Sequence, residues 1–117
     1  MLFLQYPPCS TCKKAKAWLD EHRLEYTARH IMEENPTFEE LKAWHQRSGL
    51  PLKKFFNTSG LLYKSLGLKD KLPGMSEEEQ LRLLASDGML VKRPILITEE
   101  RILVGFREKE WMDALFD

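Results

Sequence analysis

The opening of the chain strongly limits its fold, because a short apolar segment leads through two prolines into a helix that carries both cysteines. Residues 2–4 (Leu-Phe-Leu) are typical of a buried strand, and Pro7-Pro8 ends that strand in a rigid turn. Apolar residues then recur at helical spacing from Ser10 to about His22. Residues 26–31 carry aromatic and β-branched side chains and predict a second strand. We therefore expect a β-α-β unit with a right-handed crossover.

The middle of the chain predicts helices rather than strands. Capping boxes begin at Thr37 and at Ser76, and each precedes apolar residues at helical spacing. Between them we expect two short helical pieces, at residues 51–56 and 60–66. A helical stretch therefore follows the β-α-β unit.

The last part of the chain returns to strands. Beyond Arg93-Pro94, residues 95–98 and 102–104 predict a β-hairpin, and residues 107–116 predict a closing helix. The expected fold class is therefore α/β, a β-α-β unit and a β-β-α unit with helices between them. At 117 residues, with 43% apolar and 31% charged residues, the chain suits one domain spanning residues 1–117.

The charge balance excludes partners that are held by bulk charge. Lys plus Arg and Asp plus Glu each number 18, so we expect no direct binding to nucleic acid or to an anionic membrane. No segment approaches the roughly 18 apolar residues of a membrane span. The first six residues lack the basic start and long apolar stretch of a secretory signal, and we expect a cytoplasmic protein.

The two cysteines lie one helical turn apart at the start of the first predicted helix. Cys9 lies at or just before the N-terminus, where free N–H groups and the helix dipole favour a thiolate, and Lys13 and Lys14 add positive potential. The spacing allows Cys9 and Cys12 to close a disulfide. In a redox cycle Cys9 would attack a substrate or a partner disulfide, and Cys12 would resolve the mixed disulfide.

Two other interpretations of the cysteine pair are less favoured. The pair could be half of a zinc site, which needs about four ligands. However, there is no second cysteine pair, and the three histidines are scattered along the chain. Inert buried thiols are common in proteins, yet the strand-turn-helix setting is specific. We therefore expect a redox pair and no metal.

Residues 8–15 (Pro-Cys-Ser-Thr-Cys-Lys-Lys-Ala), residues 92–95 (Lys-Arg-Pro-Ile) and Val104-Gly105 resemble the arsenate reductase ArsC/Spx family. The resemblance covers essentially the whole chain. It implies a thioredoxin-like fold with a helical insertion between its two halves. It also implies that Pro94 is cis and that Arg93 helps to hold an oxyanion beside Cys9. A surface ion pair is the alternative role for Arg93.

The resemblance further implies that arsenate is held by three arginines, in enzymes that have a single active-site cysteine. This chain matches one of these arginines, at Arg93. Asn57 stands where we align the second, and Phe106 stands near the third, with Arg107 beside it. We therefore expect an ArsC-like thiol oxidoreductase with a weakened oxyanion site, which places arsenate itself in doubt as the substrate.

The expected site residues and partners follow from this resemblance. The expected catalytic residues are Cys9, Cys12 and Arg93. The expected substrate-binding residues are Lys13, Asn57 and Pro94. No cofactor is expected to bind tightly, and electrons would come from glutathione with glutaredoxin, or from thioredoxin. The alternative function is a redox-sensing regulator of the Spx type, which carries the same C-x-x-C spacing and binds the RNA polymerase α-subunit.

Overall fold

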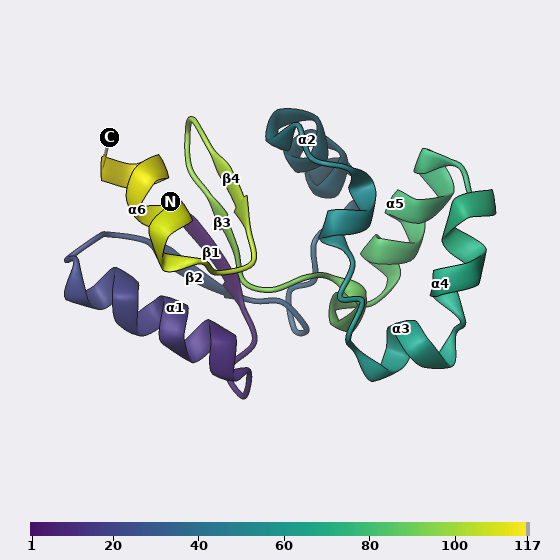
Figure 1. The fold of residues 1–117 in the computed structure, drawn as a ribbon, viewed down its shortest axis with the longest axis horizontal. Coiled ribbons are helices and arrows are strands. Elements are labelled where there is room, and N and C mark those ends of the chain that lie inside the picture. Colours follow the sequence, from purple (N-terminus) through teal and green to yellow (C-terminus); the bar gives the residue numbers. More distant parts are fainter. Residues whose placement is uncertain (117) are drawn as a thin grey trace. The chain divides into compact units, whose positions relative to one another are not determined.

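The computed structural model describes residues 1–116, which pack into two compact units. The sheet unit comprises Met1–His30 together with residues 93–116. The helical unit comprises Ile31–Lys92 and is inserted between the two segments of the sheet unit. Figure 1 follows the chain from one unit into the other and back.

The sheet unit contains one four-stranded sheet and two helices. Its elements are β1 (Leu2–Gln5), α1 (Ser10–Glu21), β2 (Thr27–His30), β3 (Ile95–Ile97), β4 (Ile102–Val104) and α6 (Glu108–Phe116). The strand order is β2-β1-β3-β4, with β1 parallel to β2 and the other neighbours antiparallel. The predicted β-α-β and β-β-α order is therefore confirmed.

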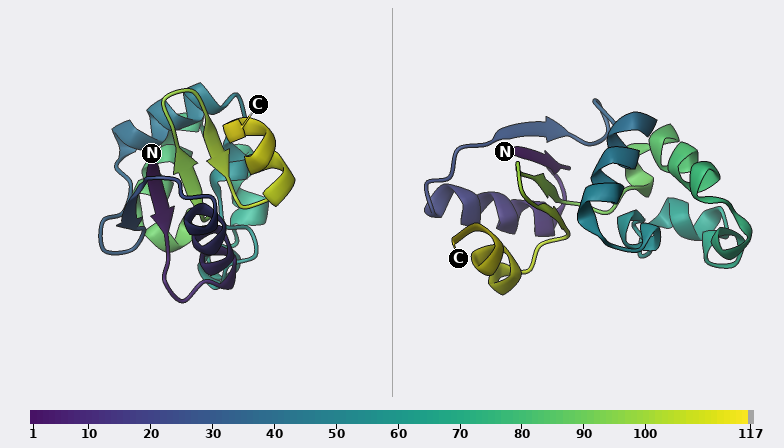
Figure 2. Two further views of the ribbon diagram at one scale, coloured as in Figure 1. Left: turned by 90° about the vertical axis from the view of Figure 1, so that its left-hand side faces the viewer. Right: turned by 90° about the horizontal axis from the view of Figure 1, so that it is seen from above.

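One face of this sheet carries the core of the unit. Phe3, Leu96 and Leu103 lie opposite one another in register across β1, β3 and β4. They join buried side chains of α1 and the buried Trp111 of α6 in a single cluster. Both helices therefore pack on the same face of the sheet, as the two views of Figure 2 show.

Helix α1 ends in a Schellman motif, in which the chain turns sharply through a left-handed residue. The N–H of Arg23 bonds to the carbonyl of Asp20, and the N–H of Leu24 bonds to the carbonyl of Leu19, both at 3.1 Å. Arg23 has a φ of 56°. Among residues 1–116 it is the one residue with a positive φ that is not a glycine. Arginine thus occupies a position that usually takes glycine.

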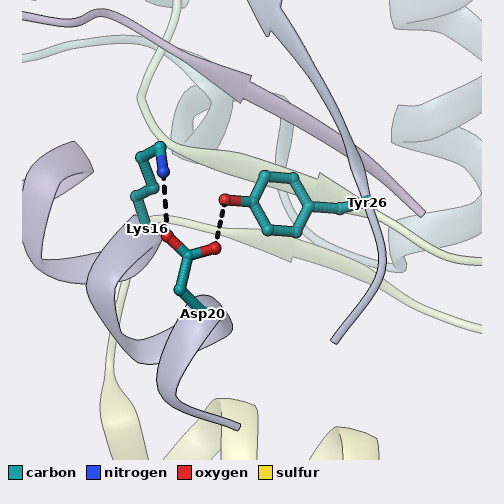
Figure 3. Close-up of polar contacts among 3 residues, drawn as sticks. All are labelled: Lys16, Asp20 and Tyr26. Carbon is teal, nitrogen blue, oxygen red and sulfur yellow. Dashed lines mark hydrogen bonds and ion pairs between the residues drawn. The ribbon is translucent and has the colours of Figure 1, made fainter. Parts of the chain in front are cut away.

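A polar triad on the surface ties α1 to the segment that leads into β2 (Figure 3). Asp20 accepts from the Lys16 ammonium at 2.8 Å and from the Tyr26 hydroxyl at 2.6 Å. These two bonds hold the pKa of the Asp20 carboxyl below its ordinary value. The Tyr26 ring also packs edge-on against Phe3, so the triad continues into the core of the sheet unit.

The helical unit contains four α-helices and three short 3₁₀ turns. They are α2 (Phe38–Ser48), η1 (Leu52–Phe55), α3 (Leu61–Ser65), α4 (Leu68–Lys71), η2 (Leu72–Gly74), α5 (Glu77–Ser86) and η3 (Gly88–Leu90). Both predicted capping boxes are confirmed, at Thr37 and at Ser76. Within residues 1–116, no helix has the length and the apolar character that a membrane crossing needs.

Candidate active site

The turn between β1 and α1 places Cys9 at the N-terminus of the helix. The Cys9 N–H bonds to the Tyr6 carbonyl at 2.9 Å and closes the turn around Pro7 and Pro8. Cys9 is the N-cap residue of α1, but its side chain makes no capping hydrogen bond. The sulfur is therefore available for chemistry at the positive end of the helix.

The surroundings of Cys9 favour its thiolate. Partial burial raises the pKa of the Cys9 thiol, but the N–H and thiol of Cys12 and the guanidinium of Arg93 favour the charged form. The net effect is a pKa below the ordinary value of a cysteine. Thiolate is the form of cysteine that attacks sulfur, so Cys9 has the properties of a nucleophile.

Cys12 has the opposite character. It is buried, and the Tyr6 N–H donates to its sulfur at 3.5 Å. Burial, with a smaller contribution from neighbouring Cys9, raises the pKa of the Cys12 thiol to about 12. Both cysteines are free thiols in the structure. Cys9 is partly exposed with a lowered pKa and Cys12 is buried with a raised one, so the two thiols differ in exposure and in acidity.

Arg93 belongs to the same unit as the two cysteines and begins the segment that leads into β3. The Arg93–Pro94 peptide bond is cis, which confirms the expectation for Pro94. The Nε and Nη1 atoms of Arg93 are buried and have no hydrogen-bond partner among residues 1–116. Two donors of this guanidinium are therefore unpaired but enclosed by protein atoms, and no carboxylate of the described chain forms an ion pair with it.

The other predicted substrate-binding residues lie in different settings. Lys13 is exposed on α1, and the groups that favour the Cys9 thiolate are Cys12 and Arg93 rather than this lysine. Pro94 is buried, and its carbonyl accepts the Gly105 N–H at 2.8 Å. Asn57 belongs to the helical unit, where its N–H bonds to the Leu90 carbonyl at 2.8 Å.

Phe106 packs within the sheet unit, where the alignment with arsenate reductases would place a third arginine. Its ring stands edge-on to Trp111 at a centroid distance of 4.8 Å and contacts Trp18 at 6.2 Å. The neighbouring Arg107 is exposed. Phe106 therefore serves the packing of the core and offers no donor to an anion.

Tyr6 was not singled out from the sequence. Its ring lies under the Arg93 guanidinium, with 4.9 Å between Cζ and the ring centroid. An aromatic residue directly before Pro7-Pro8 and the cysteine motif was the available signal. Its contact with Arg93 depends on the pairing of β1 with β3, which one segment of sequence does not reveal.

The candidate site thus combines a thiolate, a buried thiol and a partly unpaired guanidinium. These groups suit thiol-disulfide exchange and the binding of an anionic group. Residues 1–116 contain no group of three His, Cys, Asp or Glu side chains arranged to hold a metal ion.

Several known proteins are similar to this chain in sequence and fold. The sequence model of the ArsC family matches residues 4–114. The crystal structure of an ArsC family related protein from Bacteroides fragilis has a TM-score of 0.93 and 63% identity, covering 96% of this chain and 94% of that one. The crystal structure of a possible arsenate reductase from Streptococcus mutans UA159 has a TM-score of 0.88 and 50% identity, covering 96% of each chain.

A regulatory protein is also similar to this chain. The global transcriptional regulator Spx of Enterococcus faecalis is 35% identical over 105 residues, which cover 89% of this chain and 77% of Spx. A protein described as a possible arsenate reductase and a protein described as a transcriptional regulator are therefore both similar to this chain.

Proposed function

The chain belongs to the ArsC family, and we propose that it is a thiol-disulfide oxidoreductase in which Cys9 is the nucleophile and Cys12 the resolving cysteine. The observation that carries this proposal is the difference between the two thiols. Cys9 is partly exposed with a lowered pKa, whereas Cys12 is buried with a pKa of about 12. A nucleophile must be ionised and accessible, and a resolving thiol must stay protonated until the first step is complete.

The two steps balance as ordinary disulfide exchange. The Cys9 thiolate attacks one sulfur of an oxidised partner, the partner's S–S bond breaks, and the other sulfur leaves as a thiolate. The mixed disulfide removes the negative charge of Cys9, which is one of the causes of the raised pKa of Cys12. Cys12 then loses its proton, attacks the Cys9 sulfur and releases the reduced partner, leaving a Cys9–Cys12 disulfide.

A second thiol system returns two electrons to this disulfide. We propose glutathione with glutaredoxin, or thioredoxin, as the external reductant, with no tightly bound cofactor. The unpaired Nε and Nη1 of Arg93 support an anionic group on the substrate, either an oxyanion or a carboxylate. Arsenate is the oxyanion that the similarity to arsenate reductases suggests, and Phe106 in place of an arginine argues for weak binding of it.

The test combines a redox titration with a trapping experiment. The Cys9–Cys12 reduction potential is measured in defined glutathione buffers, and Cys12→Ser is used to trap mixed disulfides with candidate partners. Turnover by a thioredoxin or glutaredoxin system, with a potential near or below that of the cytosol, supports the oxidoreductase. Failure to form the disulfide at all contradicts it. Arsenate reduction, measured with the same reductants, decides whether arsenate is a substrate.

The second candidate is a redox-sensing regulator that binds the RNA polymerase α-subunit. The observation in its favour is the 35% identity with Spx over most of this chain. The test is a pull-down with the C-terminal domain of the α-subunit, using the reduced and the oxidised protein. Absence of binding in both redox states excludes this function.

A further inference from the structure

Tyr6 contacts both cysteines through its backbone. Its carbonyl accepts the Cys9 N–H at 2.9 Å, and its N–H donates to the Cys12 sulfur at 3.5 Å. The same short turn therefore fixes the positions of Cys9, the buried Cys12 thiol and the Tyr6 backbone from which the ring extends.

The Tyr6 ring contacts the two residues that flank the helical insertion in the chain, His30 before it and Arg93 after it. The Arg93 Cζ lies 4.9 Å from the ring centroid, a distance at which a guanidinium is attracted by an aromatic face. His30 stands edge-on to the ring, with 5.7 Å between centroids and an angle of 90° between the ring planes. His30 is the partner of Gln5 in the parallel register, so β2 supports the ring from the neighbouring strand.

The Arg93 guanidinium has few polar partners. Its Nε and Nη1 have no hydrogen-bond partner in the described chain, and no carboxylate there pairs with it. A long side chain loses considerable rotamer freedom when its end group is held in one place. The face of Tyr6 is a contact that holds this end group, together with the sulfur of Cys9.

We propose that Tyr6 is a positioning residue, whose aromatic face holds the Arg93 guanidinium beside the sulfur of Cys9. This proposal rests on the proposed function, in which Cys9 is the nucleophile, and adds a residue that acts through Arg93. The Tyr6 hydroxyl makes no hydrogen bond to any residue from 1 to 116, so the ring rather than the hydroxyl carries the effect.

The test measures how fast iodoacetamide alkylates Cys9 in the reduced full-length protein, as a function of pH. Mass spectrometry assigns the modification to Cys9 or Cys12. The titratable and charged groups that face the Cys9 sulfur are Cys12 and Arg93. Loss of the ring in Tyr6→Leu is expected to raise the midpoint of the pH profile and to slow alkylation below it by about two- to fivefold.

Two replacements at the same position separate the ring from the hydroxyl and from the shape. Tyr6→Phe keeps the aromatic face and is expected to match the wild-type profile. Pentafluorophenylalanine at position 6 keeps the size of the ring but removes its negative face, and is expected to slow alkylation as leucine does. A slow phenylalanine variant, or a pentafluorophenylalanine variant with the wild-type rate, overturns the proposal.

A double-mutant cycle shows whether Tyr6 acts through Arg93. Arg93→Met alone is expected to slow alkylation of Cys9, and adding Tyr6→Leu is expected to slow it no further. If Tyr6→Leu has its full effect in the Arg93→Met background, the ring acts by another route and the proposal is wrong.

Phe38→Leu is the matched control. In the helical unit the Arg82 Cζ lies 4.8 Å from the Phe38 ring, so this variant removes a similar contact in the other unit. It is expected to leave the alkylation profile of Cys9 unchanged, and a shift equal to that of Tyr6→Leu contradicts the proposal.

None of these alkylation rates depends on turnover of a substrate. If the variants show the expected alkylation rates but the wild-type protein forms no Cys9–Cys12 disulfide, only the proposed function is contradicted. If turnover is normal but Tyr6→Leu leaves the alkylation rate of Cys9 unchanged, only the positioning role is contradicted.

Discussion

Gly88 lies against the backbone carbonyl of Ile31, and a Cβ atom added to Gly88 would overlap the oxygen of that carbonyl and lie 2.8 Å from its carbon. Both atoms belong to main chain, so neither moves without shifting the backbone around it. We therefore expect Gly88→Ala to lower the free energy of unfolding by about 1–3 kcal/mol, as overpacking does at tight sites. Urea denaturation followed by circular dichroism measures this difference.

Gly74→Ala is the matched control for that substitution. An added Cβ at Gly74 meets no atom within 4 Å, so this variant is expected to change the free energy of unfolding by less than about 0.5 kcal/mol. Equal effects at the two positions would show that the close approach to Ile31 does not limit the residue at position 88.

Arg23→Gly is expected to stabilise the protein, because glycine adopts the left-handed conformation at this helix end without strain. The φ of 56° strains any residue with a Cβ, while glycine loses more chain entropy on folding, so we expect a net gain of roughly 0.5–1 kcal/mol. Thermal unfolding of the two proteins measures it.

Arg23→Ala separates the backbone effect from loss of the arginine side chain. Alanine keeps the Cβ and its strain, so this variant is expected to show no comparable gain. A similar stabilisation by alanine and by glycine would mean that the positive φ is not the cause.

Burial of Cys12 predicts a loss of stability at alkaline pH. The pKa of its thiol is about 12 in the folded protein, so from the ordinary value of 9.0 upward the unfolded chain releases this proton and the folded protein keeps it. The stabilisation is therefore complete below pH 9.0 and is lost as the pH rises towards about 12, at no more than about 1.4 kcal/mol per pH unit. Cys12→Ser, which has no thiol there, is expected to lose less stability over this range in urea titrations.

Cys9 contributes with the opposite sign. Its folded-state pKa is lowered, so the folded protein is deprotonated before the unfolded chain is, and stability rises with pH between that lowered pKa and 9.0. Cys9→Ser is expected to flatten this rise and to leave the alkaline loss in place. If Cys9→Ser instead removed the alkaline loss, the assignment of the two thiols would have to be reversed.

The unpaired donors of Arg93 predict that an oxyanion protects Cys9 from alkylation. Sulfate or arsenate held by the Arg93 guanidinium, which interacts with the Cys9 sulfur, would block the reagent, so we expect these ions at tens of millimolar to slow alkylation by about twofold or more. Chloride at matched ionic strength controls for screening. The protection should disappear in Arg93→Met, and protection that survives this substitution would locate the anion elsewhere.

The elements that could be predicted from sequence are those with strong local signals. The helices that begin after Thr37 and Ser76 were predicted from their capping boxes, and the hairpin of β3 and β4 from two apolar runs around a polar turn. Helix α4 was not predicted, because it has four residues and directly follows Gly67, which was interpreted as the end of the preceding helix.

The candidate site divides in the same way. The character of Cys9 follows from its place at a helix N-terminus, which the local sequence reveals. The expectation for Arg93 came from the resemblance to a family, and Tyr6 was missed. Both take part in a contact between residues far apart in sequence, and that contact exists because β1 and β3 pair in the folded sheet.

The Tyr6 ring also marks where the helical insertion leaves and rejoins the sheet unit. His30 is the last residue before the insertion and Arg93 the first after it, and both contact this one ring. The insertion is therefore a loop whose two ends are fixed at neighbouring points, and doubling the length of such a loop adds only about 0.6 kcal/mol of closure entropy. Closure entropy therefore sets little limit on the length of chain between His30 and Arg93, provided that these two residues still meet at that aromatic side chain.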